Sequence, residues 1–201
     1  MPLSLALWVT LGLAACTMGS QTTDMRSPDT SASPTDTTMT LFDFTSTDGS
    51  DWRIQNDGVM GGRSKGYAEI SNETLRFTGT VIMRGGGFTS VIARRDVDLS
   101  GFDGVEMRVR GGGRTFEVDF FDGTQDRGRD ISRRGAFPTT EDWQTVQVAF
   151  DDLRTSVHGE PIQVEPLDRA AIQSIGLYII DGQDGPFELE VDWIRAYRTD
   201  A

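Results

Sequence analysis

The sequence has almost none of the residues from which disulfide frameworks and zinc sites are built. Among 201 residues there is one cysteine, Cys16, and one histidine, His158. A single cysteine cannot form a disulfide within the chain. One cysteine and one histidine are also too few to build a tetrahedral zinc site from Cys and His ligands. A Ser-His-Asp triad would depend on His158, which lies in the polar stretch RTSVHGEPIQ, and we interpret it as a loop residue.

Positive charge is also scarce. The chain has 19 Lys and Arg against 31 Asp and Glu, which gives a formal net charge of −12. Because nucleic-acid binding requires a basic surface, we expect no nucleic-acid partner. Carboxylates this frequent are typical of solvated faces, so pairs such as Asp151-Asp152 and Glu188/Glu190 do not by themselves indicate acid–base catalysis. We therefore predict that the protein is not an enzyme.

Long apolar runs are absent except near the N-terminus. The run LSLALWVTLGLAAC, residues 3–16, is too short to span a bilayer and matches the apolar region of a signal peptide, although no Lys or Arg precedes it. Its end, LAAC, resembles the lipobox of bacterial lipoproteins, which implies a signal peptide over residues 1–15 and lipidation of Cys16. We predict a protein of the bacterial cell envelope, on the exported side of a membrane that it contacts only through its lipid anchor. An apolar N-terminus with a free thiol is the alternative.

The segment after the lipobox has almost no large apolar side chains. Residues 17–39 hold eleven Ser and Thr and two Pro. Such a segment cannot bury enough apolar surface to offset the entropy that it would lose on folding. We predict a disordered Ser/Thr-rich tether over residues 16–39 and one folded domain over residues 40–199.

Glycine and short alternating runs are what the rest of the chain has in abundance. Turn signals such as Asp48-Gly49 and Asp122-Gly123 separate runs in which apolar and polar residues alternate, for example GVEMRVR, TFEVDFF and QTVQVAF. Period-two runs bounded by turns predict half-buried antiparallel strands. One short helical pattern occupies residues 166–174. The predicted fold class is all-β, a jelly-roll β-sandwich with at most one short helix.

Two of the alternating runs predict a hairpin whose loop is residues 111–114. In the register that the pattern specifies, Arg108 faces Glu117 and two carboxylates, Glu106 and Asp119, face each other. The apolar residues of both strands then share the core face: Val105, Met107, Val109, Phe116, Val118 and Phe120.

The stretch WRIQNDGVMGGRSKG, residues 52–66, is rich in glycine but does not fit a phosphate loop. It lacks the Gly-Lys-Ser/Thr order, and no helix follows it. A calcium loop at residues 122–130 also fails, because its Gly comes one position late and Arg133 stands where the bidentate Glu belongs. Met, Gly-Gly and Ser recur in the same order in MRGGGFTS, residues 83–90, so two glycine-rich loops could meet at one end of a sandwich.

These two stretches, with the later DLSGFDGVEMRVRGGGRTFEV, DWQTVQVAFDDL and GPFELEVDWIRAY, resemble the complex I intermediate-associated protein 30 family over residues 41–198. The motif Asn-Asp-x-Val-Met-Gly-Gly-x-Ser at residues 56–64 and Gly-Gly-Phe-x-Ser-Val at residues 86–91 carry the resemblance. The family usually continues with Arg where this chain has Ile92. The resemblance implies a galactose-binding-like jelly roll, the fold of many carbohydrate-binding modules. It also suggests an assembly role, because the mitochondrial members of the family help to assemble respiratory complex I.

The two glycine-rich loops form the candidate binding surface. Asp57 and Ser64 would provide polar contacts while the glycines set the backbone path, or both side chains would hold the loop by hydrogen bonds to its amides. The candidate residues are Asn56, Asp57, Met60, Gly61, Gly62, Ser64, Gly86, Gly87, Phe88 and Ser90.

Two functions remain open on the sequence. The first is a non-enzymatic, assembly-factor-like module that binds a protein partner of the envelope or membrane. The second is a carbohydrate-binding module that stacks a glycan on Trp52, Trp143 or Trp193, although the alternation of Trp193 with Val191 favours a core position for it.

No cofactor and no metal site are predicted. A structural calcium ion is the minor alternative, because Asp43 and Asp192 lie on the first and last predicted strands and could share oxygen ligands. Two ordinary strand carboxylates are the preferred interpretation.

Overall fold

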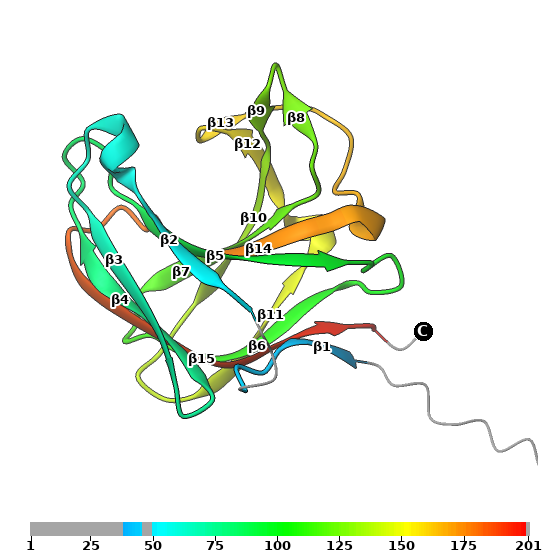
Figure 1. The fold of residues 1–201 in the computed structure, drawn as a ribbon, viewed down its shortest axis with the longest axis horizontal. Coiled ribbons are helices and arrows are strands. Elements are labelled where there is room, and N and C mark those ends of the chain that lie inside the picture. The colour runs from blue at the N-terminus through cyan, green and yellow to red at the C-terminus, as the bar shows by residue number, and fades with distance from the viewer. Residues whose placement is uncertain (1–37, 46–49, 200–201) are drawn as a thin grey trace, which may run out of the picture. The chain divides into compact units, whose positions relative to one another are not determined.

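The computed structural model of the protein describes residues 38–45 and 50–199. These residues form two antiparallel sheets that pack face to face, with short 3-10 helices in the connections (Figure 1). The predicted signal peptide, Cys16 and nearly all of the predicted tether lie outside the described residues. Within the described part of the chain, no helix is long and apolar enough to cross a membrane.

We name each sheet after one of its interior strands. The β15 sheet has the strand order β11-β6-β15-β4-β3, and β1 also pairs with β15. Its strands are β1 (Thr38–Phe42), β3 (Lys65–Ser71), β4 (Thr74–Val81), β6 (Gly104–Arg110), β11 (Gln144–Ala149) and β15 (Gly185–Tyr197).

The β14 sheet has the strand order β13-β12-β10-β7-β14-β5-β2. Its strands are β2 (Trp52–Asn56), β5 (Thr89–Val97), β7 (Thr115–Phe121), β10 (Ser132–Pro138), β12 (Arg154–Val157), β13 (Glu160–Pro161) and β14 (Ile172–Ile179). A small separate hairpin joins β8 (Gln125–Asp126) to β9 (Arg129–Asp130). The 3-10 helices are η1 (Asp57–Met60), η2 (Phe150–Asp152) and η3 (Arg169–Ala171).

The predicted all-β sandwich is confirmed, whereas some local predictions need correction. Strand β1 begins at Thr38, just before the domain boundary predicted at residue 40. The helix predicted over residues 166–174 is only the 3-10 turn η3, and the chain is already extended in β14 from Ile172. The side chain of Ile172 is buried in the core, so tertiary packing overrides the local helical pattern there.

The predicted core face between the sheets is confirmed. The six apolar side chains assigned to it from residues 105–120 are all fully buried, because period-two alternation places them on one face of each strand. Phenylalanine rings of both sheets meet in this core, as where Phe116 of β7 approaches Phe187 of β15 with ring centroids 6.2 Å apart. The burial of these faces is the main favourable term that holds the sheets together.

The hairpin predicted around residues 111–114 is wrong. Strand β6 pairs with β11 and β15, whereas β7 pairs with β10 and β14, so the two strands belong to opposite sheets. Arg108 lies opposite Thr145, not Glu117, and Glu106 and Asp119 are on the outer faces of different sheets. The glycine loop carries the chain across the sandwich instead of folding it back. Two strands with buried faces can meet across a core as well as side by side, and the alternating pattern is the same in both cases.

A buried ion pair fixes the loops at one end of the β14 sheet. Arg133 is 1% exposed, and its guanidinium donates to Asp122 Oδ1 at 3.0 Å and to the carbonyl of Glu165 at 3.1 Å. The Asp122 carboxylate also accepts from the backbone N–H groups of Thr124 and Asp168, both at 2.9 Å. The pair therefore anchors the irregular segment that leads to η3. Both of its charged groups have hydrogen-bonding partners, but among the described residues none accepts from the buried Nε–H of Arg133.

Candidate functional site

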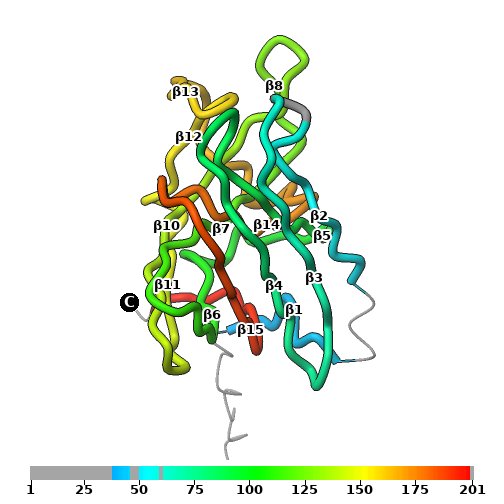
Figure 2. Tube along the Cα trace, turned by 90° about the vertical axis from the view of Figure 1, so that its left-hand side faces the viewer, coloured from blue at the N-terminus to red at the C-terminus, as the bar shows by residue number. Residues whose placement is uncertain are grey.

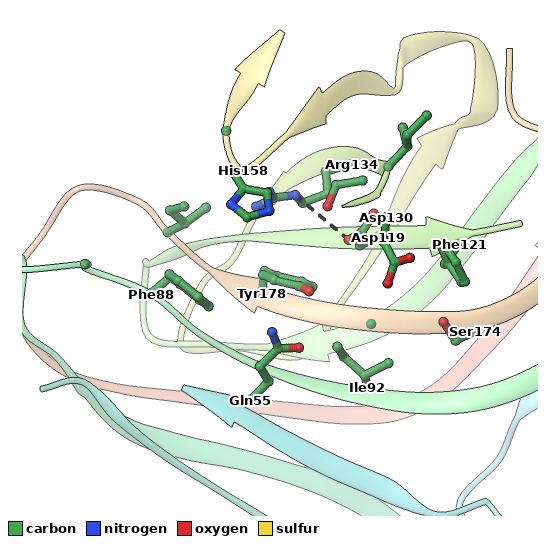
Figure 3. A pocket seen from close by; sticks show the side chains of 16 residues that line it. Gln55, Phe88, Ile92, Asp119, Phe121, Asp130, Arg134, His158, Ser174 and Tyr178 are labelled. Carbon is green, nitrogen blue, oxygen red and sulfur yellow. Dashed lines mark ion pairs between the residues drawn. The ribbon is translucent and has the colours of Figure 1, made fainter. Parts of the chain in front are cut away.

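The outer face of the β14 sheet carries an open groove of about 490 Å³ (Figure 3). Outward-facing residues of neighbouring strands form its floor, and two hairpins, β8–β9 and β12–β13, add further residues at one end. The lining residues are Gln55, Gly86, Phe88, Ile92, Asp119, Phe121, Asp130, Ile131, Ser132, Arg134, His158, Gly159, Ser174, Gly176, Tyr178 and Ile180.

The groove is deep at Gly176 because this residue of β14 has no side chain. In one row across the sheet, Gly176 lies opposite Ile92 of β5 on one side and Asp119 of β7 on the other. A Cβ placed at residue 176 would lie 3.1 Å from Ile92 Cγ1 and 3.1 Å from Tyr178 Cε2. Because Gly176 has no side chain, no atoms of residue 176 rise between Ile92 and Tyr178, and the floor there is hollow.

Two hairpins extend the groove at one end, the separate β8–β9 hairpin and the β12–β13 hairpin at the edge of the β14 sheet. The β8–β9 hairpin contributes Asp130, and the β12–β13 hairpin contributes His158 and Gly159. Both hairpins project at the same end of the molecule in two perpendicular views (Figures 1 and 2). His158 has a left-handed backbone conformation, φ +50°, and is followed by Gly159 at φ +85°. The tight turn places the one histidine of the chain at the groove, a location that the loop interpretation did not predict.

Two aromatic rings form one wall of the groove. Phe88 and Tyr178 are stacked with centroids 6.4 Å apart and an interplanar angle of 27°. In Figure 3 they lie between Gln55 below and His158 above. Burial, followed by the nearby Asp119 carboxylate, raises the pKa of Tyr178 to about 12, so its hydroxyl remains a neutral donor at physiological pH.

The opposite part of the groove floor is charged. Asp119 is 9% exposed and accepts a hydrogen bond from the backbone N–H of Arg133 at 2.8 Å. Burial raises the pKa of Asp119 to about 6, against the opposing effect of Arg134. The Arg134 guanidinium lies 4.8 Å above the Tyr178 ring and pairs with Glu117 at 3.4 Å, while its Nε is 4.0 Å from Asp119 Oδ2.

The family-like motif lies beside this groove, and its acidic residue is buried. We call Asp57, Ser64 and the backbone amides of Ile82 and Gly87 the Asp57 cluster. Asp57 Oδ2 accepts from Ser64 Oγ at 2.6 Å and from the Gly87 N–H at 2.8 Å, and Oδ1 accepts from the Ser64 N–H at 3.0 Å. Ser64 Oγ in turn accepts from the Ile82 N–H at 3.0 Å. Burial alone would raise the pKa of Asp57, but the donors from Ser64 and Gly87 outweigh it and hold the pKa below its ordinary value.

The glycines of both loops pack directly against Asp57. A Cβ at Gly62 would lie 2.1 Å from Asp57 Cγ, and one at Gly86 would lie 2.6 Å from Asp57 Cβ. The two loops meet, since a Cβ at Gly85 would lie 2.9 Å from the Gly61 carbonyl oxygen. The interior position of Asp57 and Ser64 supports the second of the two roles considered above, in which they hold the loops through hydrogen bonds to backbone amides.

The structure brings the ten candidate residues together, but only two of them line the groove. Gly86 and Phe88 do so, and their loop is held by the Asp57 cluster. Asn56 Oδ1 accepts from the Gly66 N–H at 2.9 Å and from Thr89 Oγ1 at 2.6 Å, and Ser90 is buried. The side chain of Met60 lies outside the described residues. The role of all ten in binding stays a prediction.

None of the three candidate tryptophans lines the groove. Trp52 packs against Phe42 with ring centroids 4.8 Å apart. Trp143 lies beneath Arg108 and Arg110 of the β15 sheet, and Trp193, which is half-buried, stacks with Arg195 at 4.2 Å. Sequence reasoning instead missed the polar and aromatic residues Gln55, Asp119, Arg134, His158 and Tyr178. The available signal was the glycine at position 176 within a strongly apolar strand.

The two carboxylates considered for calcium have other partners. Asp192 pairs with Arg108 at 2.6 Å, and Asp43 accepts from the backbone and side chain of Thr45 at 3.1 and 2.8 Å. Among residues 38–45 and 50–199, no group of three or more His, Cys, Asp or Glu side chains is placed to hold a metal ion. The groove likewise has no set of residues converging as metal ligands.

The fold and the groove define a β-sandwich of the galactose-binding-like type with an open groove on the outer face of one sheet. Residues 42–191 match the model of the family Complex I intermediate-associated protein 30 (CIA30). The chain belongs to this family.

A curated relative carries the same family name. The mouse protein "Complex I intermediate-associated protein 30, mitochondrial" is 30% identical over 173 residues, which cover 75% of this chain and 53% of the mouse protein. The chain therefore spans about half the length of the curated relative that it matches.

Solved structures with a similar fold include carbohydrate-binding modules. The family 11 module of cellulase Lic26A-Cel5E from Clostridium thermocellum has a TM-score of 0.61 at 14% identity, over 81% of this chain and 95% of that one. The Clostridium thermocellum family 11 module in complex with a β-1,3-1,4-mixed-linked tetrasaccharide has a TM-score of 0.60 at 14% identity, over 81% and 96%. At this level of identity the similarity establishes the fold.

The packing of the loops predicts a large difference between two neighbouring glycines. In Gly62→Ala the new methyl group would collide with the Asp57 carboxylate, which its hydrogen bonds hold in place, and we expect a loss of about 2–3 kcal/mol in unfolding free energy. In the matched control Gly58→Ala, the methyl group would meet no atom within 4 Å, and we expect a change of less than about 1 kcal/mol. Urea unfolding of both variants measures this difference, and equal losses would contradict the packing argument.

The raised pKa of Asp119 predicts a specific pH dependence of stability. Between the ordinary value of 3.8 and about 6, the folded state binds more protons at this carboxyl than the unfolded chain does. The contribution of Asp119 to the unfolding free energy should therefore fall as pH rises through this window, by at most roughly 3 kcal/mol. Asp119→Asn lacks the titrating group, so the stability of the wild type relative to this variant should decrease from pH 3.5 to pH 7. A constant difference in denaturant unfolding across this range would show that Asp119 is not perturbed.

Proposed function

We propose that the protein is a non-catalytic binding module that holds a carbohydrate chain in the groove of the β14 sheet. The observation that carries the proposal is the combination of the Phe88–Tyr178 wall with hydrogen-bonding side chains across a floor left hollow by Gly176. Sugars present flat C–H faces that stack on aromatic rings and hydroxyl groups that require placed polar partners. Gln55 and Ser174 supply neutral partners, and Asp119 supplies a charged acceptor.

The size and openness of the site support a chain-like ligand. A volume of about 490 Å³ is within the range of ligand-binding clefts, roughly 300–1,000 Å³. The groove is open, and hairpins bound it at one end, so an extended oligosaccharide could lie along it without threading. The tetrasaccharide complex of the structurally similar family 11 module supports the same ligand class.

We further propose that the domain works outside the cytoplasm of a bacterium on a lipid anchor. The apolar run that ends in LAAC, with Cys16 as the lipidated residue and a Ser/Thr-rich tether behind it, supports this location. An anchored binding module would keep its ligand, or the structure that contains the ligand, close to the membrane.

Filling the hollow floor tests the carbohydrate proposal. Wild type and Gly176→Val are titrated by calorimetry with neutral oligosaccharides: mixed-linkage glucan tetrasaccharide, β-1,4-linked and β-1,3-linked glucose hexamers, and agaro-oligosaccharides. We expect at least one to bind the wild type, and Gly176→Val to bind it at least about tenfold more weakly, a change of 1.4 kcal/mol or more. Thr80→Leu, which adds apolar volume at an exposed position of the other sheet, should bind like the wild type. Equal binding by all three proteins would place the ligand elsewhere, and no binding to any probe would remove the proposal.

A protein partner is the second candidate function, and family membership favours it. The name of the mouse relative states an association with a complex I intermediate, which suggests an assembly-factor-like role for this chain. Affinity purification from solubilised membranes, with wild type and Gly176→Val side by side, separates the two candidates. A stoichiometric protein recovered with both would indicate assembly through another surface, and one lost from the variant would indicate a protein segment in the groove.

Cys16→Ser should move the chain from the membrane to the soluble fraction if the proposed anchor is correct.

A further inference from the structure

The cationic side chains at the groove floor are already neutralised by the protein itself. Arg134 pairs with Glu117 at 3.4 Å, approaches Asp119 Oδ2 at 4.0 Å and lies with one face over Tyr178. Its side chain is only 13% exposed. Arg154, which lies opposite Arg134 in the sheet, forms an ion pair with the same Glu117 carboxylate. An incoming anion would have to compete with these internal carboxylates for each guanidinium.

The carboxylates outnumber the arginines that face them. Asp119 and Asp130 line the groove together with the one guanidinium of Arg134, and Glu117 stands next to it. Asp130 accepts a hydrogen bond from the side chain of Gln125 at 2.8 Å. The chain as a whole carries a formal net charge of −12, so no long-range field attracts an acidic ligand to this face.

Asp119 has acceptor capacity directed at the groove. Its Oδ1 accepts from the N–H of Arg133 at 2.8 Å, and the carboxylate also accepts from the side chain of Ser132, but its Oδ2 lies 4.0 Å from Arg134 Nε, beyond hydrogen-bonding distance. An ionised carboxylate is an acceptor only and can accept several hydrogen bonds. Ligand hydroxyl groups donate to such an oxygen and form charge-assisted hydrogen bonds, but a ligand carboxylate or sulfate has no proton to donate.

We propose that the groove selects uncharged, hydroxyl-rich glycans over acidic ones, with Asp119 as the residue that determines this specificity. The inference rests on the proposed carbohydrate-binding function and names the ligand class for it. A neutral sugar satisfies Asp119 with its hydroxyl protons and leaves the Arg134–Glu117 pair intact. An acidic sugar places a second anion beside Asp119 in a partly buried site, where desolvation without a free counter-charge is costly.

Matched pairs of probes test the selection in the wild-type protein. Each neutral glucan oligosaccharide is compared with its counterpart in which the C6 hydroxymethyl groups are oxidised to carboxylates, so that linkage and length stay the same. At pH 7.5 and low salt we expect the acidic form to bind at least tenfold more weakly than the neutral form. Equal or tighter binding of the acidic form would overturn the selection while leaving the carbohydrate-binding function in place. Failure of every neutral probe would overturn both.

Two charge-matched variants test the role of Asp119. In Asp119→Asn, Arg134 loses one of its two carboxylate neighbours, so the neutral-to-acidic affinity ratio should fall at least threefold. Asp96→Asn removes one negative charge from an exposed ion pair with Arg94 that does not line the groove, and its ratio should match that of the wild type. Equal shifts in both variants would show that net charge alone selects the ligand and would overturn the role of Asp119. Thermal melting confirms that each variant is folded, and the wild-type comparison requires no variant at all.

Discussion

The arrangement of the loops beside the groove depends on one buried carboxylate. A carboxylate taken out of water must receive hydrogen bonds from the protein, and Asp57 receives them from Ser64 and from the amide of Gly87. These donors belong to two loops that are distant in sequence, so satisfying the charge also joins the loops. Because Phe88 follows Gly87 directly, the same bond fixes the start of the aromatic wall. The glycine-rich motif at residues 56–64 thus acts on the groove through the Asp57 side chain, which holds the backbone of the second loop.

The groove itself follows from the geometry of the β14 sheet. Alternation sends one set of side chains into the core and leaves the other set facing outward, where three sheet neighbours, Ile92, Gly176 and Asp119, form the floor. The inner set is mostly apolar and supplies most of the stability of the sandwich. The outer set is therefore free to vary in chemistry, and in this chain it combines aromatic rings with carboxylates paired to arginines. Stability and recognition are carried by opposite faces of the same strands.

The sequence predicted the parts of the structure that depend on local patterns. Period-two alternation in residues 105–120 correctly indicated which side chains are buried, because burial depends on the face of a strand. It could not indicate that β6 and β7 lie in different sheets, since alternation contains no information on which strand is the neighbour. The pattern at residues 166–174 failed for a related reason, because the burial of Ile172 in a strand outweighs a weak local preference.

The groove could not be predicted either, because the sequence does not show which strands are neighbours in a sheet. Gln55, Asp119 and Tyr178 come from three strands that are far apart along the chain, and no motif connects them. The glycine-rich motif was recognisable, but its buried position could not be inferred. The sequence alone does not distinguish a glycine in tight packing from a glycine in an exposed turn. Only the distances from Gly62 and Gly86 to the Asp57 side chain distinguish the two cases.

The glycine at the centre of the groove floor has a consequence for the comparison of relatives. Its backbone does not have the left-handed conformation that would demand glycine, so another residue can occupy the position once Ile92 and Tyr178 shift by a few tenths of an ångström. The residue found there in another member of the family is then an indicator of its groove. A relative with glycine can keep the hollow, whereas one with a branched or aromatic residue has closed it while retaining the sandwich. A single alignment column would thereby divide the family into members with and without a recess on this sheet, before any of their structures is determined.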